Sequence, residues 1–233
     1  MSVLTPQDYY STEEEFYNNL KDLAGKRLLF YCATGSSGRK DVVPGWSDID
    51  VILIFDQLNE AVFTLLNKAI KKNTTGIKIG TTFYSAEEWK VYKFQDPKTF
   101  YAISYIKIGL YKPKICDSKI KLQELSPELL DILNQMNLSK ELHAFKRALL
   151  EPLDEKIIYK LMSSILRIIL LGEGIISAGY HDVWTKMKNK YPDFPLSLIT
   201  PEEIMNNPNN FHLRLKEYKD FLIWFDKNVH DLL

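Results

Sequence analysis

The amino-acid sequence predicts an α+β fold in which a small mixed β-sheet is followed by a C-terminal helical bundle. Strand patterns are confined to the first half of the chain, where residues 27–33, 49–55 and 76–85 form short apolar or β-rich runs. After residue 120 these patterns end and helical periodicity takes over. We therefore expect two domains, 1–120 with a sheet of about four or five strands and 121–233 with helices.

The first domain is predicted to begin with a helix and then to alternate strands with helices. The segment from Ser11 to Glu14 has the pattern of a helix start, and Gly25 is expected to end that helix. Residues 27–33 predict a buried strand, and residues 49–55 (IDVILIF), apolar on both faces, predict a central one. The other predicted elements are an amphipathic helix over 57–73, a strand over 76–85, a helix from Glu87 and a short strand over 109–115.

The second domain is predicted to be built around one apolar helix. Residues 157–171 (IIYKLMSSILRIILL) are apolar nearly all round, which is typical of the core helix of a bundle. Gly172 and Gly174 are expected to end or bend it. Residues 181–190 and 211–231 have the periodicity of further amphipathic helices.

The composition is that of an ordinary globular protein and narrows the classes of partner. Thirty basic and thirty acidic residues cancel, whereas a general nucleic-acid binder normally carries a basic excess. Apolar runs are too short to span a membrane, and the N-terminus lacks the pattern of a signal peptide. The two cysteines have no paired spacing, which indicates reduced thiols and a cytoplasmic location. Nothing in the sequence decides the oligomeric state.

Two carboxylates at the start of the 49–55 strand are the first candidate site. Asp48 and Asp50 are two residues apart, so in a strand their side chains point to one face. Carboxylates this close repel each other, and Mg²⁺ (or Mn²⁺) relieves the repulsion because it prefers oxygen ligands. The pair alone fits a loop-to-strand junction with two solvated acids equally well.

A glycine-serine segment precedes this pair. Gly35 and Ser36 follow the first predicted strand, and eleven residues separate Ser36 from Asp48. Glycine allows backbone N–H groups to approach a triphosphate, and a serine hydroxyl and a helix start add further donors. On its own the GSSG run is typical of a flexible loop. The order strand, Gly-Ser, polar segment, Asp-x-Asp and strand favours a phosphate site.

This order of motifs resembles the nucleotidyltransferase superfamily that includes DNA polymerase β. The closer likeness, over roughly residues 25–90, is to antibiotic adenylyltransferases and to minimal nucleotidyltransferases, in which a helical domain follows. The resemblance implies that Asp48 and Asp50 are catalytic and bind Mg²⁺ or Mn²⁺, and that ATP or another NTP is the substrate. It implies nucleotide binding by Gly35, Ser36, Ser37 and Arg39, although a solvated surface role for Arg39 remains open.

One position departs from the family pattern. The family places a third carboxylate on the strand that follows the next helix, and the matching position here is Gly80. Glu87 and Glu88 are the nearest acids, but they fall on the following helix, where first-turn acids offset the helix dipole. Either a base comes from elsewhere or catalysis is lost. The candidate bases are Glu87, Glu88, Glu151, Glu155 and His181.

The helical half bears a fainter likeness to the C-terminal domain of streptomycin- and spectinomycin-type adenylyltransferases. The residues on which this likeness rests are Leu166-Arg167-Ile168, Gly174, Val183-Trp184 and Tyr191-Pro192. In those enzymes a lysine after the glycine reaches the nucleotide phosphates. Residues 177–182 hold no lysine, so His181 or Lys186 would take that role. Arg167, on an apolar helix, is expected to form a structural salt bridge.

Two functions are therefore expected as alternatives. The first is transfer of AMP, or another NMP, from an NTP to a hydroxyl of a small molecule or protein. The second is a non-catalytic nucleotide-binding or antitoxin-like interaction protein of the same fold. An aminoglycoside acceptor would require an acidic cleft, and the twelve acids and ten bases of residues 151–233 do not decide that question. Trp46, before the aspartates, is expected either to stack on a base or to pack over the loop.

Overall fold

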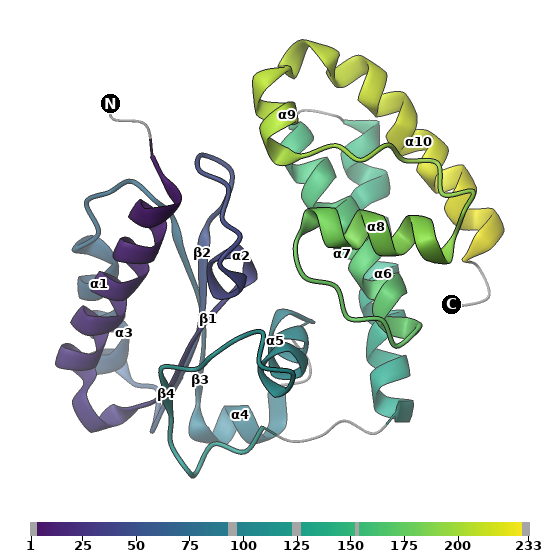
Figure 1. Cartoon of the computed structure of the whole chain (residues 1–233). Helices are drawn as coiled ribbons and strands as arrows, with labels where there is room; N and C mark the ends of the chain where they lie inside the picture. The colour runs from purple at the N-terminus through teal and green to yellow at the C-terminus, as the bar shows by residue number, and fades with distance from the viewer. Residues whose placement is uncertain (1–3, 93–96, 123–126, 152–153, 230–233) are drawn as a thin grey trace. The chain divides into compact units, whose positions relative to one another are not determined.

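The computed structural model describes residues 4–92, 97–122, 127–151 and 154–229. The chain divides into two compact units, Met1–Glu124 and Leu125–Leu233. Figure 1 shows a sheet with helices in the purple-to-teal unit and helices in the green-to-yellow one. This arrangement confirms the predicted α+β class, a small mixed sheet followed by a helical part.

The sheet has four strands in the order β3-β2-β1-β4. They are β1 Leu28–Thr34, β2 Ile49–Phe55, β3 Ile79–Ser85 and β4 Ile115–Cys116. Strand β1 is antiparallel to both β2 and β4, whereas β2 and β3 are parallel. The IDVILIF segment is thus an inner strand, as predicted. No strand from beyond residue 116 joins the sheet within the described part of the chain.

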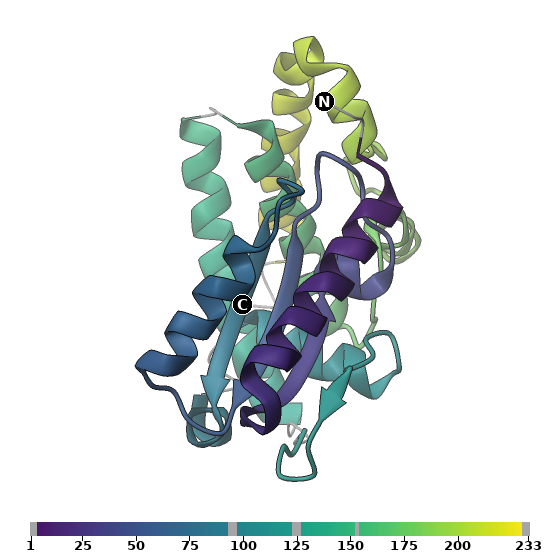
Figure 2. The ribbon, with the colours of Figure 1, turned by 90° about the vertical axis from the view of Figure 1, so that its left-hand side faces the viewer.

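One face of the sheet is covered by α1 (Pro6–Ala24) and α3 (Glu60–Lys71), which lie in front of the strands in Figure 2. Side chains of β2 alternate between the two faces, and every second one enters this core. The core cluster includes Phe16 and Leu20 of α1, Ile49, Val51, Leu53 and Phe55 of β2, and Val62 and Leu66 of α3. Burial of this apolar surface is the main force that holds the two helices to the sheet.

Helix α1 begins five residues earlier than the Ser11 start predicted from the sequence. The backbone N–H and the hydroxyl of Thr5 both donate to the Asp8 carboxylate, at 2.6 and 2.8 Å, and Pro6 occupies the first helical position. Threonine, proline and an acid in these places form a strong helix start. The predicted end is confirmed, because Gly25 takes φ +56° directly after the helix.

On the opposite face of the sheet, α4 (Ala86–Tyr92) packs against β2 and β3. The Thr99 hydroxyl of α5 (Pro97–Lys107) lies 2.9 Å from the Tyr84 hydroxyl of β3. Trp89 stacks on Phe30 with ring centroids 6.1 Å apart. Helix α5 has no counterpart among the sequence predictions. The strand predicted over 109–115 is wrong except at its last residue, because Gly109 takes φ +76° and Pro113 has no N–H to donate to a ladder.

The second unit contains α6 Pro127–Leu150, α7 Glu155–Gly172, α8 Tyr180–Lys190, α9 Pro201–Asn206 and α10 Phe211–Asn228. Helix α7 is its core helix, as predicted. It buries Ile158, Met162, Leu166 and Ile169, but Ile157 is 53% exposed, so one side faces water. Helices α8 and α10 match the predictions for 181–190 and 211–231 to within a few residues. Within the described residues no helix has the length and apolarity needed to cross a membrane.

Candidate functional site

The carboxylate of Asp50 lies between two glycines on neighbouring parts of the sheet. Asp50 pairs with Thr34 on β1 and with Gly80 on β3. A Cβ atom added at Gly35, directly after Thr34, would lie 3.1 Å from Asp50 Oδ2. A Cβ atom added at Gly80 would lie 2.9 Å from Asp50 Oδ1. The two glycines therefore make the space that the carboxylate occupies.

Asp48 precedes strand β2 by one residue. Ile49, between the two aspartates, is fully buried in the core under α1 and α3, and its N–H donates to the Lys78 carbonyl at 2.9 Å. Because side chains alternate along extended backbone, Asp48 and Asp50 share the opposite side. Both residues are half-buried.

The Gly-Ser segment forms the short helix α2 (Gly35–Arg39), which begins where β1 ends. Gly35 takes φ +58°, a conformation that favours glycine. Ser36 is half-buried and follows it. Ser37 is fully buried, and its hydroxyl has no hydrogen-bond partner within the described residues. A hydroxyl without exposed surface cannot contact a nucleotide, so only the backbone of Ser37 is left for the predicted role.

Arg39 is neither a solvated surface arginine nor an unoccupied cation. Its side chain is 8% exposed, and Nε donates to Asp41 Oδ2 at 3.0 Å. Its Nη1 also lies 3.4 Å from the Tyr111 hydroxyl. These contacts fix the guanidinium within the first unit. A phosphate contact through Arg39 would have to share or replace the Asp41 carboxylate.

The sheet supplies no third acid near Asp50. Strand β3 (IGTTFYS) carries none, and Glu87 and Glu88 lie beyond its far end, on α4. Because β2 and β3 run parallel, that end is level with Phe55, five residues from Asp50. At roughly 3.3 Å per residue, the Cα atoms of Asp50 and Phe55 are about 16 Å apart. Two of the five candidate bases are therefore excluded from direct contact with a reaction at Asp50.

Both acids of α4 also have local partners. Glu88 forms a capping box with Ser85, in which the Ser85 N–H donates to Glu88 Oε2 at 2.8 Å and the Glu88 N–H to Ser85 Oγ at 3.1 Å. Glu87 is 80% exposed at its side chain and pairs with Lys90 at 2.6 Å. Their positions are those of first-turn acids that stabilise a helix start.

A third candidate base, Glu155, is occupied by a buried ion pair. Nη2 of Arg214 donates to Glu155 Oε2 at 2.6 Å, and the Tyr218 hydroxyl donates to Oε1 at 2.9 Å. Glu155 and Arg214 are both buried. A carboxylate that accepts these bonds holds α7 to α10 and is not available as a proton acceptor.

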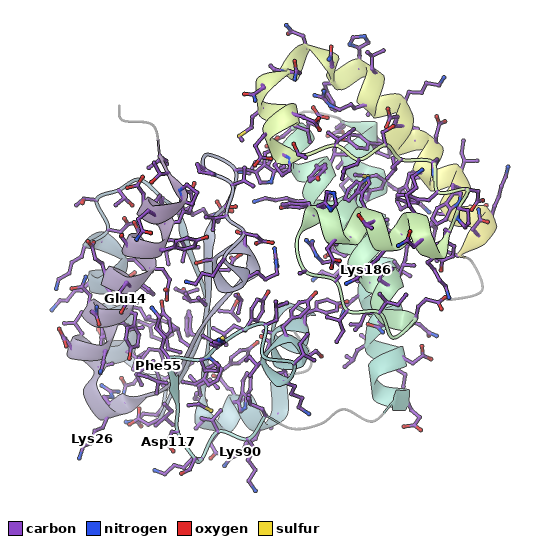
Figure 3. All side chains as sticks on the ribbon, in the orientation of Figure 1. Glu14, Lys26, Phe55, Lys90, Asp117 and Lys186 are labelled. Atoms are coloured by element: carbon purple, nitrogen blue, oxygen red, sulfur yellow. The ribbon has the colours of Figure 1, made fainter. Side chains whose placement is uncertain are left out.

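Glu151 and His181 remain as candidate bases from the helical unit. Both are exposed, and Nδ1 of His181 lies 3.4 Å from the Thr185 hydroxyl. Lys186, labelled on α8 in Figure 3, donates to Asp182 and to the Ile176 carbonyl, each at 2.8 Å. Any role of Lys186 toward a phosphate would compete with these two contacts.

The other predicted residues have mainly structural surroundings. Arg167 donates to Ser163 Oγ at 2.8 Å and to the Ala178 carbonyl at 3.3 Å, and it lies over the Tyr180 ring. Trp46 is 2% exposed, which favours packing over the loop and leaves no ring surface for a base.

The residues near Asp50 make an incomplete metal site by themselves. Within the described residues no group of three or more His, Cys, Asp or Glu lies close enough together to hold a metal ion. A cation held by Asp48 and Asp50 would take its other ligands from a substrate and from water. No model of a known protein family matches the chain, and no curated protein matches it.

Proposed function

We propose that this chain is a Mg²⁺- or Mn²⁺-dependent nucleotidyltransferase that moves AMP, or another NMP, from an NTP to a hydroxyl of a small molecule or protein. The observation that carries the proposal is the position of the Asp50 carboxylate between Gly35 and Gly80. It brings an oxygen ligand for a cation directly beside the Gly-Ser segment. Asp48 adds a second carboxylate on the same side.

The donor set suits a hard divalent cation. Asp48 and Asp50 offer carboxylate oxygens, and both are only half-buried. When bound there, such an ion would neutralise charge on the triphosphate oxygens. The backbone at Gly35 and the hydroxyl of Ser36 would orient the triphosphate through hydrogen bonds.

The reaction is a displacement at the α-phosphorus. The acceptor oxygen forms a bond to the α-phosphorus, and the bond from that phosphorus to the oxygen bridging to the β-phosphorus breaks. Pyrophosphate leaves with the electron pair, and the hydroxyl proton passes to a base. Of the five candidate bases, Glu155 is held in a buried ion pair, Glu87 and Glu88 lie at the far end of β3, and Glu151 and His181 have exposed side chains.

The proposal predicts transfer of label from ATP that carries ³²P at the α-position. Purified protein, Mg²⁺ and a lysate should give a labelled small molecule or protein. Asp50→Asn should abolish the transfer, and Asp22→Asn, at an exposed position on α1, should leave it unchanged. Equal labelling by the two variants would contradict the proposed role of Asp50.

The alternative is a non-catalytic nucleotide-binding or antitoxin-like protein of the same fold. The feature that favours it is β3, which has glycine where the family pattern has a carboxylate. The two functions differ in one result. A protein that binds Mg²⁺-ATP through Asp50 but never transfers label to any acceptor in the lysate has the second function.

A further inference from the structure

Gly80 has a conformation that any residue accepts, which makes its identity informative. It is not one of the glycines with left-handed φ. Glycine weakens the interior of a strand, and it often marks a position where another group approaches closely. Here that group is Asp50, whose Oδ1 would lie 2.9 Å from a Cβ atom at position 80. The carboxylate, rather than the backbone, accounts for the glycine.

The contact between Asp50 and position 80 bears on how many divalent cations the site can hold. Catalytic sites with two divalent ions hold them about 3.5–4 Å apart. Such ions take oxygen ligands, so two of them bound this close together need more carboxylate charge than one. The described strands offer one carboxylate, Asp50, and Asp48 directly before β2 offers a second. The neighbouring position on β3 is Gly80. Oδ1 of Asp50 also occupies the space into which a side chain from β3 would extend.

We propose that Gly80 makes this a one-cation site, in which Asp48 and Asp50 bind a single divalent ion that arrives with the triphosphate. The inference rests on the proposed function and specifies its chemistry. In two-ion sites one ion activates the attacking oxygen and the other the leaving group. With one ion beside the triphosphate, no second ion is near the acceptor hydroxyl. A side-chain base would then have to take the proton of that hydroxyl.

Counting bound Mn²⁺ tests the proposal without any turnover. The protein is saturated with an ATP analogue that has a methylene group between the α- and β-phosphorus, and free Mn²⁺ is measured by electron paramagnetic resonance. We expect one Mn²⁺ per bound nucleotide in the wild type. Gly80→Asp adds a third carboxylate, and Asp50 Oδ1 has to shift to make room for it. Because the nucleotide is saturating, any loss of nucleotide affinity does not change the count, and this variant should bind two Mn²⁺. Gly80→Asn, its matched control, has the same size without the charge and should bind no more than one.

The outcomes separate this inference from the function on which it rests. Two Mn²⁺ ions per nucleotide in the wild type would overturn the one-cation site and leave the proposed function standing. A wild type that binds neither nucleotide nor Mn²⁺ overturns both. A folded Gly80→Asp that still binds one ion contradicts the role assigned to Gly80. If that variant does not fold, the wild-type count decides the stoichiometry by itself.

Discussion

Asp50 and Gly80 are directly opposite each other on the parallel strands β2 and β3, and Oδ1 of Asp50 lies 2.9 Å from the point where a Cβ atom at position 80 would be. Gly80→Ala places a methyl group at that point. We expect the carboxylate to turn away and the affinity for the Mn²⁺-nucleotide complex to fall by roughly tenfold, about 1.4 kcal/mol.

The control for this variant is a glycine in open space. A Cβ atom at Gly172, the last residue of α7, meets nothing within 4 Å, and its φ is not left-handed. Gly172→Ala should therefore leave nucleotide affinity unchanged. Calorimetric titration of both variants checks the prediction, and an equal affinity for Gly80→Ala and the wild type would mean that the position of Asp50 does not matter for binding.

Glu155 is predicted to act on stability rather than on proton transfer. Its ion pair with Arg214 is buried, and removal of one partner leaves the other charge uncompensated. Glu155→Gln should lower the free energy of unfolding by about 3–5 kcal/mol, measured by urea denaturation. Glu151→Gln, at an exposed position, should change it little. A stable Glu155→Gln variant that had lost only transferase activity would reverse this assignment.

A buried hydrogen bond between Tyr31 of β1 and Glu13 of α1 predicts that the protein loses stability at alkaline pH. The Tyr31 hydroxyl donates to Glu13 at 2.7 Å, and burial followed by the charge of Glu13 raises the pKa of Tyr31 far above its usual 10.0. The unfolded state ionises Tyr31 above pH 10 while the folded state does not. Stability contributed by the neutral phenol is therefore present below pH 10 and lost above it.

The test compares urea unfolding of the wild type and Tyr31→Phe from pH 8 to pH 11. Phenylalanine keeps the ring but cannot ionise, so the variant should lose less stability over this interval. Parallel curves for the two proteins would show that Tyr31 does not contribute to the alkaline loss.

The two cysteines should differ in reactivity. Cys32 is buried in β1, and burial raises the pKa of its thiol to about 12, whereas Cys116 is exposed on β4. The thiolate is the reactive form, so a thiol reagent at pH 8 should modify Cys116 first. We expect one modified thiol per native chain and two after addition of denaturant. Rapid modification of two thiols in the native protein would mean that β1 opens.

The sequence predicted the elements whose patterns are local. The apolar run of β2 and the C-terminal ends of α1 and α7 are set by nearby residues, and they occur where expected. Helix α5 (PKTFYAISYIK) is rich in aromatic and β-branched residues, which favour strands. Its helical form depends on tertiary packing, in which Ala102, Ile103 and Tyr105 are buried, and no local pattern reports that.

The candidate site was predictable in its residue types but not in its contacts. The order of the motifs and the family resemblance made Gly35, Asp48 and Asp50 candidates. The contact between Asp50 and Gly80 depends on the register of two strands separated by α3, and sequence spacing does not give that register. The burial of Ser37 and the ion pair of Glu155 likewise depend on residues that are distant in the chain.

The most direct test of the account is a calorimetric titration of the full chain with the methylene-bridged ATP analogue, with and without Mg²⁺. The account predicts binding of one nucleotide that requires Mg²⁺, with at least a tenfold loss of affinity in Asp50→Asn and in Asp48→Asn. Asp22→Asn should bind like the wild type. Binding that is independent of Mg²⁺, or equally strong in all four proteins, would contradict the claim that these two aspartates form a nucleotide-metal site.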